Sequence, residues 1–209
     1  AVAARGIAVT APLDRLMTGV AGDFFSPMGF ANFGAAFNDP SVAWEHWGPE
    51  CKLMSRARGR PIWLPNGRTI AGPQAVRNKE FPLGYPWLRG KMAERVRKSN
   101  SMAQHSLERL KWRVQNWGFC VIEHPLNSWL WEFPLARWLQ ELPGVYFTVW
   151  WNCCYGGARI KGSALLPNLS LIHFLRCRRR VSCPFLRLCL LFTSLAPPPH
   201  HHTTPFLLY

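Results

Sequence analysis

A thiol and a carboxylate stand just after two predicted strands. Cys51 lies in the segment WGPECKLMSRAR, which follows a short strand expected over 41–47. Glu123 lies in VIEHP, at the end of the apolar run 119–122. A thiolate is a nucleophile, and a carboxyl group held protonated can donate a hydrogen bond to a substrate ring. In an open α/β sheet, ligands bind past the carboxyl ends of the strands, so the two side chains are predicted to converge on one substrate there.

The order of elements around these residues is typical of a parallel α/β sheet. Apolar residues at three- and four-residue spacing predict one long helix over 90–117, which Gly118 ends. Strands are predicted at 41–47, over FCVIE and over GVYFTVWWN, where β-branched and aromatic residues are frequent. The segment SWLWEFPLARWLQEL is predicted to be helical in part, with an interruption at Pro134. We therefore expect an α/β fold with helices flanking the sheet.

Positive charge is concentrated between residues 52 and 113. This stretch holds fifteen Lys and Arg residues against three acidic residues, and so carries +12 of the formal charge of +14. Its first part, 52–90, has Pro or Gly every few residues, which predicts a long extended loop region. Arginine, glycine and aromatic residues in mixture are what phosphate contacts and base stacking use. The predicted nucleic-acid-binding residues are Arg56, Arg58, Arg60, Arg68, Arg77, Lys91, Arg95, Arg97 and Lys98.

The bulk composition limits the class of protein. The 209 residues are 48% hydrophobic and 17% charged, which is globular composition in a chain long enough for one domain with a core. The charge of +14 favours a polyanionic partner, either nucleic acid or an anionic membrane surface. The seven cysteines are odd in number and lack the spacing of a disulfide framework or a zinc site. We expect reduced thiols, no metal and an intracellular protein, nuclear if it acts on DNA.

The composition divides the chain into three parts. Residues 1–40 are rich in Ala, Gly and Phe and predict a poorly defined segment of loop and short helix, and 41–176 is the predicted α/β domain. Residues 177–209 contain no acid but a Pro run and a His run, and predict a disordered, low-complexity or artefactual tail. The apolar stretch in this tail is shorter than the ~20 residues that span a bilayer. We therefore expect no stable membrane insertion, with a tail anchor as the alternative.

The pairing of Cys51 and Glu123 resembles the cytosine-5 DNA methyltransferase family. That family has a Pro-Cys loop after its fourth strand, whose Cys attacks C6 of cytosine, and an E-N-P motif after the next strand, whose Glu contacts N3 and the exocyclic amine. The resemblance implies that Cys51 is the nucleophile and Glu123 the base-edge contact, and it places Arg159 near the family's active-site arginine. It also implies a partial Rossmann-like methyltransferase sheet, S-adenosylmethionine as cofactor and DNA as partner.

More specifically, GPECKLMSRARGRP, GPQAVR and NCCYGGARIK resemble methyltransferase-like proteins of mobile elements and multigene families in protists and algae. This resemblance covers at most residues 41–176. Three features differ from the family pattern: Glu50 separates Pro49 from Cys51, His124 replaces the Asn of E-N-P, and only DFFSPMGFANFG resembles the Gly-rich cofactor motif. We therefore expect a partial or degenerate copy.

The same residues have simpler interpretations. Cys51 can be an ordinary loop cysteine, Glu123 the cap of a following helix, and the basic loop a solvated surface. In function, the alternative to a methyltransferase-like domain is a nucleic-acid-binding module from a mobile element, whose binding does not depend on Cys51. A third possibility is a peripheral membrane protein that uses its Arg-rich, apolar tail.

Overall fold

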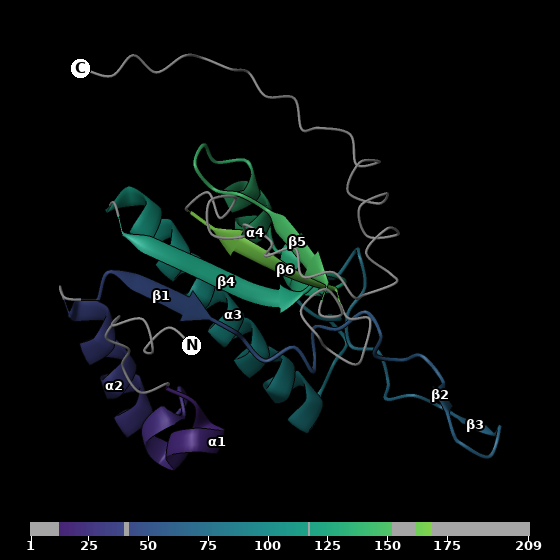
Figure 1. Ribbon diagram of the computed structural model, residues 1–209. Coiled ribbons are helices and arrows are strands. Elements are labelled where there is room, and N and C mark those ends of the chain that lie inside the picture. The colour runs from purple at the N-terminus through teal and green to yellow at the C-terminus, as the bar shows by residue number, and fades with distance from the viewer. Residues whose placement is uncertain (1–12, 40–41, 117, 152–161, 169–209) are drawn as a thin grey trace.

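A four-stranded mixed sheet forms the centre of the computed structural model, which describes residues 13–39, 42–116, 118–151 and 162–168 (Figure 1). The strands are β1 (Trp44–Trp47), β4 (Phe119–Pro125), β5 (Thr148–Trp151) and β6 (Gly162–Pro167), in the spatial order β1-β4-β6-β5. β1 and β4 are parallel, whereas β6 is antiparallel to both β4 and β5. The expectation of an α/β fold is confirmed, and the expectation of a parallel sheet is wrong for β6.

The reversed strand β6 has a simple cause. Ten residues, 152–161, separate it from β5, and a crossover between parallel strands takes a dozen or more residues. The segment GSALLP has little β propensity of its own, so it was not predicted as a strand. It is a strand because it pairs on both edges, with Val121 to Pro125 on one side and with β5 on the other.

The long predicted helix is α3 (Gly90–Gln115), which precedes β4 and packs on one face of the sheet (Figure 1). Its buried residues include Val96, Ala103, Leu107 and Leu110, which the apolar spacing had placed on one side. The prediction of this helix is confirmed.

A second helical segment covers the same face. A 3-10 turn, η3 (Trp129–Glu132), is followed by α4 (Pro134–Gln140), and Pro134 occupies the first turn of α4, where its missing N–H costs nothing. The predicted interruption at Pro134 is therefore confirmed as a helix start. The core between sheet and helices includes Met54, Leu107, Leu110, Ile122, Leu130, Phe133, Leu139 and Leu166, each at most 1% exposed.

The N-terminal segment is more helical than expected. It contains α1 (Arg15–Thr18), the 3-10 turn η2 (Gly19–Gly22) and α2 (Pro27–Asn38). Ser26 begins α2, because its hydroxyl accepts a hydrogen bond from the N–H of Gly29 at 2.8 Å and Pro27 follows at the first helical position. The rings of Phe33 and Phe37 then pack on Trp47 of β1, with ring centres 5.9 and 5.2 Å apart.

A buried charge cluster joins β1 to α3. The carboxylate of Glu45 accepts hydrogen bonds from Arg109 Nε at 2.9 Å and from Arg113 Nε at 2.6 Å. Burial raises the pKa of Glu45, but hydrogen bonds from Arg109, Trp47 and Arg113 outweigh it, so the pKa lies below its usual range. Glu45 is therefore charged at neutral pH and offsets one of the two positive charges of Arg109 and Arg113.

Candidate nucleic-acid interface

The loop that carries Cys51 runs beside the segment that follows β4. Both lie just past the carboxyl ends of the two parallel strands. Backbone contacts join the two segments: Trp129 N–H to Met54 C=O at 2.8 Å, Arg56 N–H to Asn127 C=O at 3.2 Å, and an isolated bridge between Ser55 and Ser128. The structure thus brings the two predicted segments together at one edge of the sheet.

Cys51 opens a tight turn within this edge, and its side chain is partly exposed. Its carbonyl accepts backbone hydrogen bonds from the residues three and four positions on, both at 3.0 Å. The arginines that follow it hold other partners. Arg56 pairs with Glu132 at 2.5 Å, and Arg58 Nε donates to the carbonyl of Gln74 at 2.8 Å. The Cys51 thiol is therefore partly exposed at this turn, and Arg56 and Arg58 are engaged with other groups.

Glu123 lies inside β4 and not beyond its end. The strand continues to Pro125, and Glu123 stands opposite Leu165 of β6. Its side chain is half-buried and points to the face opposite that of Ile122 and His124, because successive residues of a strand alternate. The predicted strand end is wrong by two residues, since β6 pairs with His124 and Pro125 as well.

His46 is a neighbour of Glu123 that sequence reasoning did not single out. It stands on β1 opposite Val121, and so shares the sheet face of Glu123 on the adjacent strand. Burial lowers the pKa of His46, and the charge of Glu123 opposes this by raising it. The pair places an imidazole and a carboxylate, two groups that exchange protons, near the carboxyl edge of β1 and β4. In the sequence, the alternation of residues in WEHW was the signal that could have placed His46 on this face.

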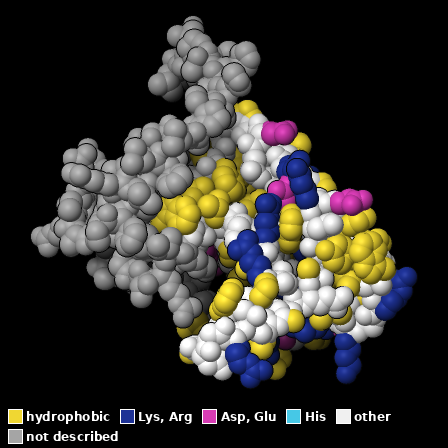
Figure 2. Space-filling view, turned by 90° about the vertical axis from the view of Figure 1, so that its right-hand side faces the viewer, with side chains coloured by type: hydrophobic (Ala, Val, Ile, Leu, Met, Phe, Trp, Pro, Cys, Tyr) yellow, Lys and Arg dark blue, Asp and Glu magenta, His cyan; other side chains and the backbone are white. Residues whose placement is uncertain are grey.

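Five of the predicted nucleic-acid-binding cations are exposed and without an acidic partner in the part of the chain that the structure describes. They are Arg60, Arg68, Lys91, Arg95 and Arg97. Figure 2 views the molecule from the side on which β2 (Ile62–Trp63) and β3 (Thr69–Ile70) lie. Lys and Arg side chains recur over the described part of this face, interleaved with hydrophobic ones. Asp and Glu side chains also appear on this face, but the five cations without an acidic partner provide charge for phosphates.

The other predicted cations are engaged to different degrees. Lys98 pairs with Glu94 at 3.2 Å on the exposed side of α3, and Arg56 stacks on the ring of Trp129, 4.4 Å from its centre, while it pairs with Glu132. These remain at the surface. Arg159 lies outside the described residues.

Arg77 is a correction to the prediction, because it is buried and serves the fold. Only 3% of it is exposed. Its guanidinium donates to the carbonyls of Leu53 at 3.1 Å and Pro82 at 2.8 Å, and to Asn100 Oδ1 at 2.6 Å. Burial lowers the pKa of Arg77 to about 10, which leaves it charged at neutral pH. Arg77 thus ties the basic loop to α3 and does not face a nucleic acid.

Exposed rings accompany the exposed cations. Trp63 is 76% exposed and Trp87 is 58% exposed. Trp87 stacks on Tyr85, with ring centres 4.7 Å apart and planes 8° from parallel. Rings held at a surface beside cations are suited to stacking on bases.

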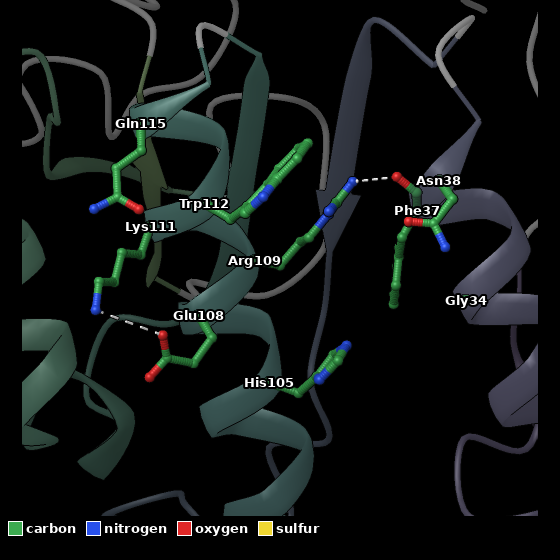
Figure 3. Close-up of a pocket in the computed structure, with 9 residues that line it drawn as sticks. All are labelled: Gly34, Phe37, Asn38, His105, Glu108, Arg109, Lys111, Trp112 and Gln115. Atoms are coloured by element: carbon green, nitrogen blue, oxygen red, sulfur yellow. Dashed lines mark hydrogen bonds and ion pairs between the residues drawn. The ribbon is translucent and has the colours of Figure 1, made fainter.

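A hollow in the described residues lies elsewhere, between α2 and α3 (Figure 3). It measures about 440 Å³ and is lined by Phe37 and Asn38 on α2 and by His105, Arg109 and Trp112 on α3. Figure 3 shows Arg109 reaching across it to the carbonyl of Phe37, to which it donates at 2.8 Å. Because Glu45 already neutralises this arginine, the hollow does not provide a free cation for an anionic ligand.

The described residues do not fit S-adenosylmethionine. In the described part before β1 the chain forms helices and turns and no strand, so no strand-to-helix loop is present there to hold the cofactor. The stretch DFFSPMGFANFG, which resembled the cofactor motif, contributes to α2 instead. Its rings are used in packing: Phe24 lies 5.0 Å from the ring of His105, and Phe33 lies against Trp47.

Comparisons with known proteins add no relative. No family model, no curated protein and no solved structure matches this chain. Within the described ranges, no helix is long and apolar enough to cross a bilayer, and no group of three or more His, Cys, Asp or Glu side chains is placed to hold a metal ion. The function therefore has to be argued from the surface and the sheet edge themselves.

Proposed function

We propose that this protein binds nucleic acid through the basic surface formed by its loop region and the first half of α3. One observation carries the proposal: the chain has no acidic residue between Glu50 and Glu80, while exposed cations occur there and on the first half of α3, and the rings of Trp63 and Trp87 are exposed in the loop region. Glu132 and Glu94 pair with Arg56 and Lys98 at this surface, whereas Arg60, Arg68, Lys91, Arg95 and Arg97 pair with no acid in the described part of the chain.

The expected behaviour follows from counterion release. Each phosphate that a Lys or Arg neutralises frees condensed cations, so the affinity falls steeply as salt rises. Two parts of the surface are held in fixed relation, because the loop packs on α3 through a small core of Leu53, Val76 and Val96, and Arg77 bonds to Asn100. A surface of fixed shape pays less ordering entropy on binding than a free basic tail does.

Fluorescence anisotropy with labelled DNA and RNA, measured over a range of salt concentrations, tests this proposal. The informative variant is Lys91→Ala/Arg95→Ala/Arg97→Ala on α3. Its matched control is Arg15→Ala/Lys111→Ala/Arg137→Ala, which removes the same charge from positions outside the surface. We expect the first variant to lose more affinity and to flatten the salt dependence by about one unit of slope per phosphate contact removed. Absence of binding at low salt, or equal loss in both variants, would refute the proposal.

The placement of the Cys51 loop beside the segment after β4 favours a second candidate. This is a cytosine-5 methyltransferase-like domain acting on DNA, in which the sheet is part of a Rossmann-like sheet and Cys51 and Glu123 face one base. Because the described residues do not fit S-adenosylmethionine, the candidate covers contact with the base and no methyl transfer. The DNA affinity of Cys51→Ala is the direct test, and it should fall if Cys51 contacts the base. If Cys51→Ala leaves the DNA affinity unchanged, this second candidate fails and only the first proposal remains.

A further inference from the structure

The hairpin β2–β3 and its flanks, residues 60–72, form an arm that lies outside the packed body of the described chain (Figure 1). Every residue of this arm except Leu64 and Gly72 is exposed. Ile62 is 44%, Trp63 76% and Ile70 49% exposed, although apolar side chains of this size normally pack. A two-stranded hairpin without a covered face is marginally stable in water by itself. The arm is therefore a segment that gains from a partner.

We propose that this arm is a ribbon that enters the major groove of double-stranded DNA. This inference rests on the proposed nucleic-acid binding. It adds that the arm is the binding element and that double-stranded DNA is the ligand. The major groove of B-form DNA is roughly 12 Å wide and admits a two-stranded β-ribbon, whereas the major groove of A-form RNA is too narrow for protein side chains to read.

The two ends of the arm are held together at its base. The backbone of Gly72 passes so close to Arg60 that a Cβ on it would overlap the Arg60 carbonyl oxygen. Gly59, at φ 93°, lies against Ala75, and Arg58 Nε bonds to the carbonyl of Gln74. A closed base keeps the two strands of the arm together as one ribbon, which a groove-entering element needs.

The tip of the arm is a defined turn. Leu64 N–H donates to the carbonyl of Arg68 at 2.8 Å, Gly67 N–H donates to the carbonyl of Leu64 at 3.0 Å, and Gly67 takes a positive φ of 77°. This three-residue loop with Gly at its last position is a common hairpin connection. From Arg60 to Leu64, where the turn begins, the arm extends about 13 Å at ~3.3 Å per residue, comparable to the width of the major groove.

The two faces of the arm differ, and its charge has one sign. In the antiparallel register Ile62 pairs with Ile70 and Trp63 with Thr69, so the indole and the isoleucines lie on opposite faces. Arg60 stands at the base and Arg68 at the tip, with no acid anywhere in the arm. Cations at both ends suit the phosphates on the two rims of a groove, and the apolar side chains between them suit base edges such as the thymine methyl group.

The experiment compares Arg60→Ala/Arg68→Ala on the arm with Lys91→Ala/Arg95→Ala on α3, which removes the same charge from the body. Affinity is measured by anisotropy for a short DNA duplex and for the RNA duplex of the same sequence. Methylation of guanine N7 by dimethyl sulfate is measured in the DNA complex, because N7 lies in the major groove. Thermal melting confirms that both variants fold.

We expect the wild-type protein to prefer the DNA duplex and to protect guanine N7. The arm variant should bind the DNA duplex roughly fivefold or more weakly, with the salt slope reduced by about two, and should lose the protection. The α3 variant should lose affinity and keep the protection. If the arm variant keeps the protection, or the wild-type protein protects no N7, the arm inference is wrong while nucleic-acid binding stands. If the wild-type protein binds neither duplex nor single strands, the proposed function itself fails.

Discussion

Replacing Glu45 with Gln is predicted to destabilise the protein strongly. The side chain of Glu45 is 9% exposed and those of Arg109 and Arg113 are 10% exposed, so the three charges meet away from water. Arg109 contacts both carboxylate oxygens, at 2.6 Å from Nη2 and 2.9 Å from Nε, and Arg113 Nε contacts Oε1 at 2.6 Å. The substitution keeps the shape of the side chain and leaves two buried guanidinium groups facing a neutral amide.

Removing one partner of a buried ion pair costs about 3–5 kcal/mol. Arg109 and Arg113 also donate to the carbonyls of Phe37 and Val42, at 2.8 and 2.9 Å, and these bonds remain in the variant. They limit the reorganisation that would relieve the uncompensated charge. We therefore expect the free energy of unfolding to fall by about 3 kcal/mol or more, which is a large part of the stability of a domain of this size.

Equilibrium urea unfolding, followed by tryptophan fluorescence, measures this loss as a lower midpoint at an unchanged slope. The matched control is Glu108→Gln, which also removes one carboxylate from a contact with a cation. Glu108 lies 3.9 Å from Lys111 at the surface of the same helix, and its loss should cost about 1 kcal/mol or less. A cost below about 1 kcal/mol for Glu45→Gln would show that the cluster is not energetically coupled as its geometry indicates.

The same carboxylate predicts a pH dependence. The pKa of Glu45 in the folded protein lies below its ordinary value of 4.5, so the folded state holds the charged form more tightly than the unfolded state does. The stability that Glu45 contributes is complete above pH 4.5 and is lost as the pH falls through the folded pKa. The difference in unfolding free energy between wild type and Glu45→Gln should therefore shrink below this pH, and a constant difference would contradict the assignment.

Three further predictions concern the loop, the arm and the thiols. Arg77→Lys should lower the free energy of unfolding in urea by about 3 kcal/mol, because a lysine lacks the forked guanidinium that donates to Leu53, Pro82 and Asn100 together. A loss equal to that of Arg97→Lys at the surface would contradict this prediction. Gly72→Ala should separate the two ends of the arm and speed proteolytic cleavage within residues 60–70, with little change in the unfolding midpoint of the body; unchanged cleavage would show that the contact of Gly72 with Arg60 does not hold the arm closed. In peptide mapping after native alkylation, Cys51 should react before Cys120, because burial raises the pKa of Cys120 and encloses it; equal rates would overturn this ordering.

Local patterns in the sequence were sufficient for the elements that dominate their own neighbourhoods. The apolar spacing of α3, the apolar run of β4 and an interruption of the helical segment at Pro134 were each predicted from adjacent residues. These features depend on side-chain periodicity and on backbone constraints that act within a few residues. The concentration of positive charge in residues 52–113 was equally visible, because charge is a property of composition.

Only the tertiary structure decided how these elements are used. The direction of β6 follows from its pairing with two strands, one of them about forty residues away in the sequence. The residue pattern of GSALLP does not predict this direction. Arg77 and Arg60 are the same residue type in the same basic loop, yet Arg77 is buried under long-range hydrogen bonds to Asn100 and Leu53, and Arg60 is exposed at the base of the arm. Glu45 and Arg109 likewise lie 64 positions apart. Charge can be counted in the sequence, but its availability depends on which distant groups neutralise or bury it, and that is a property of the fold.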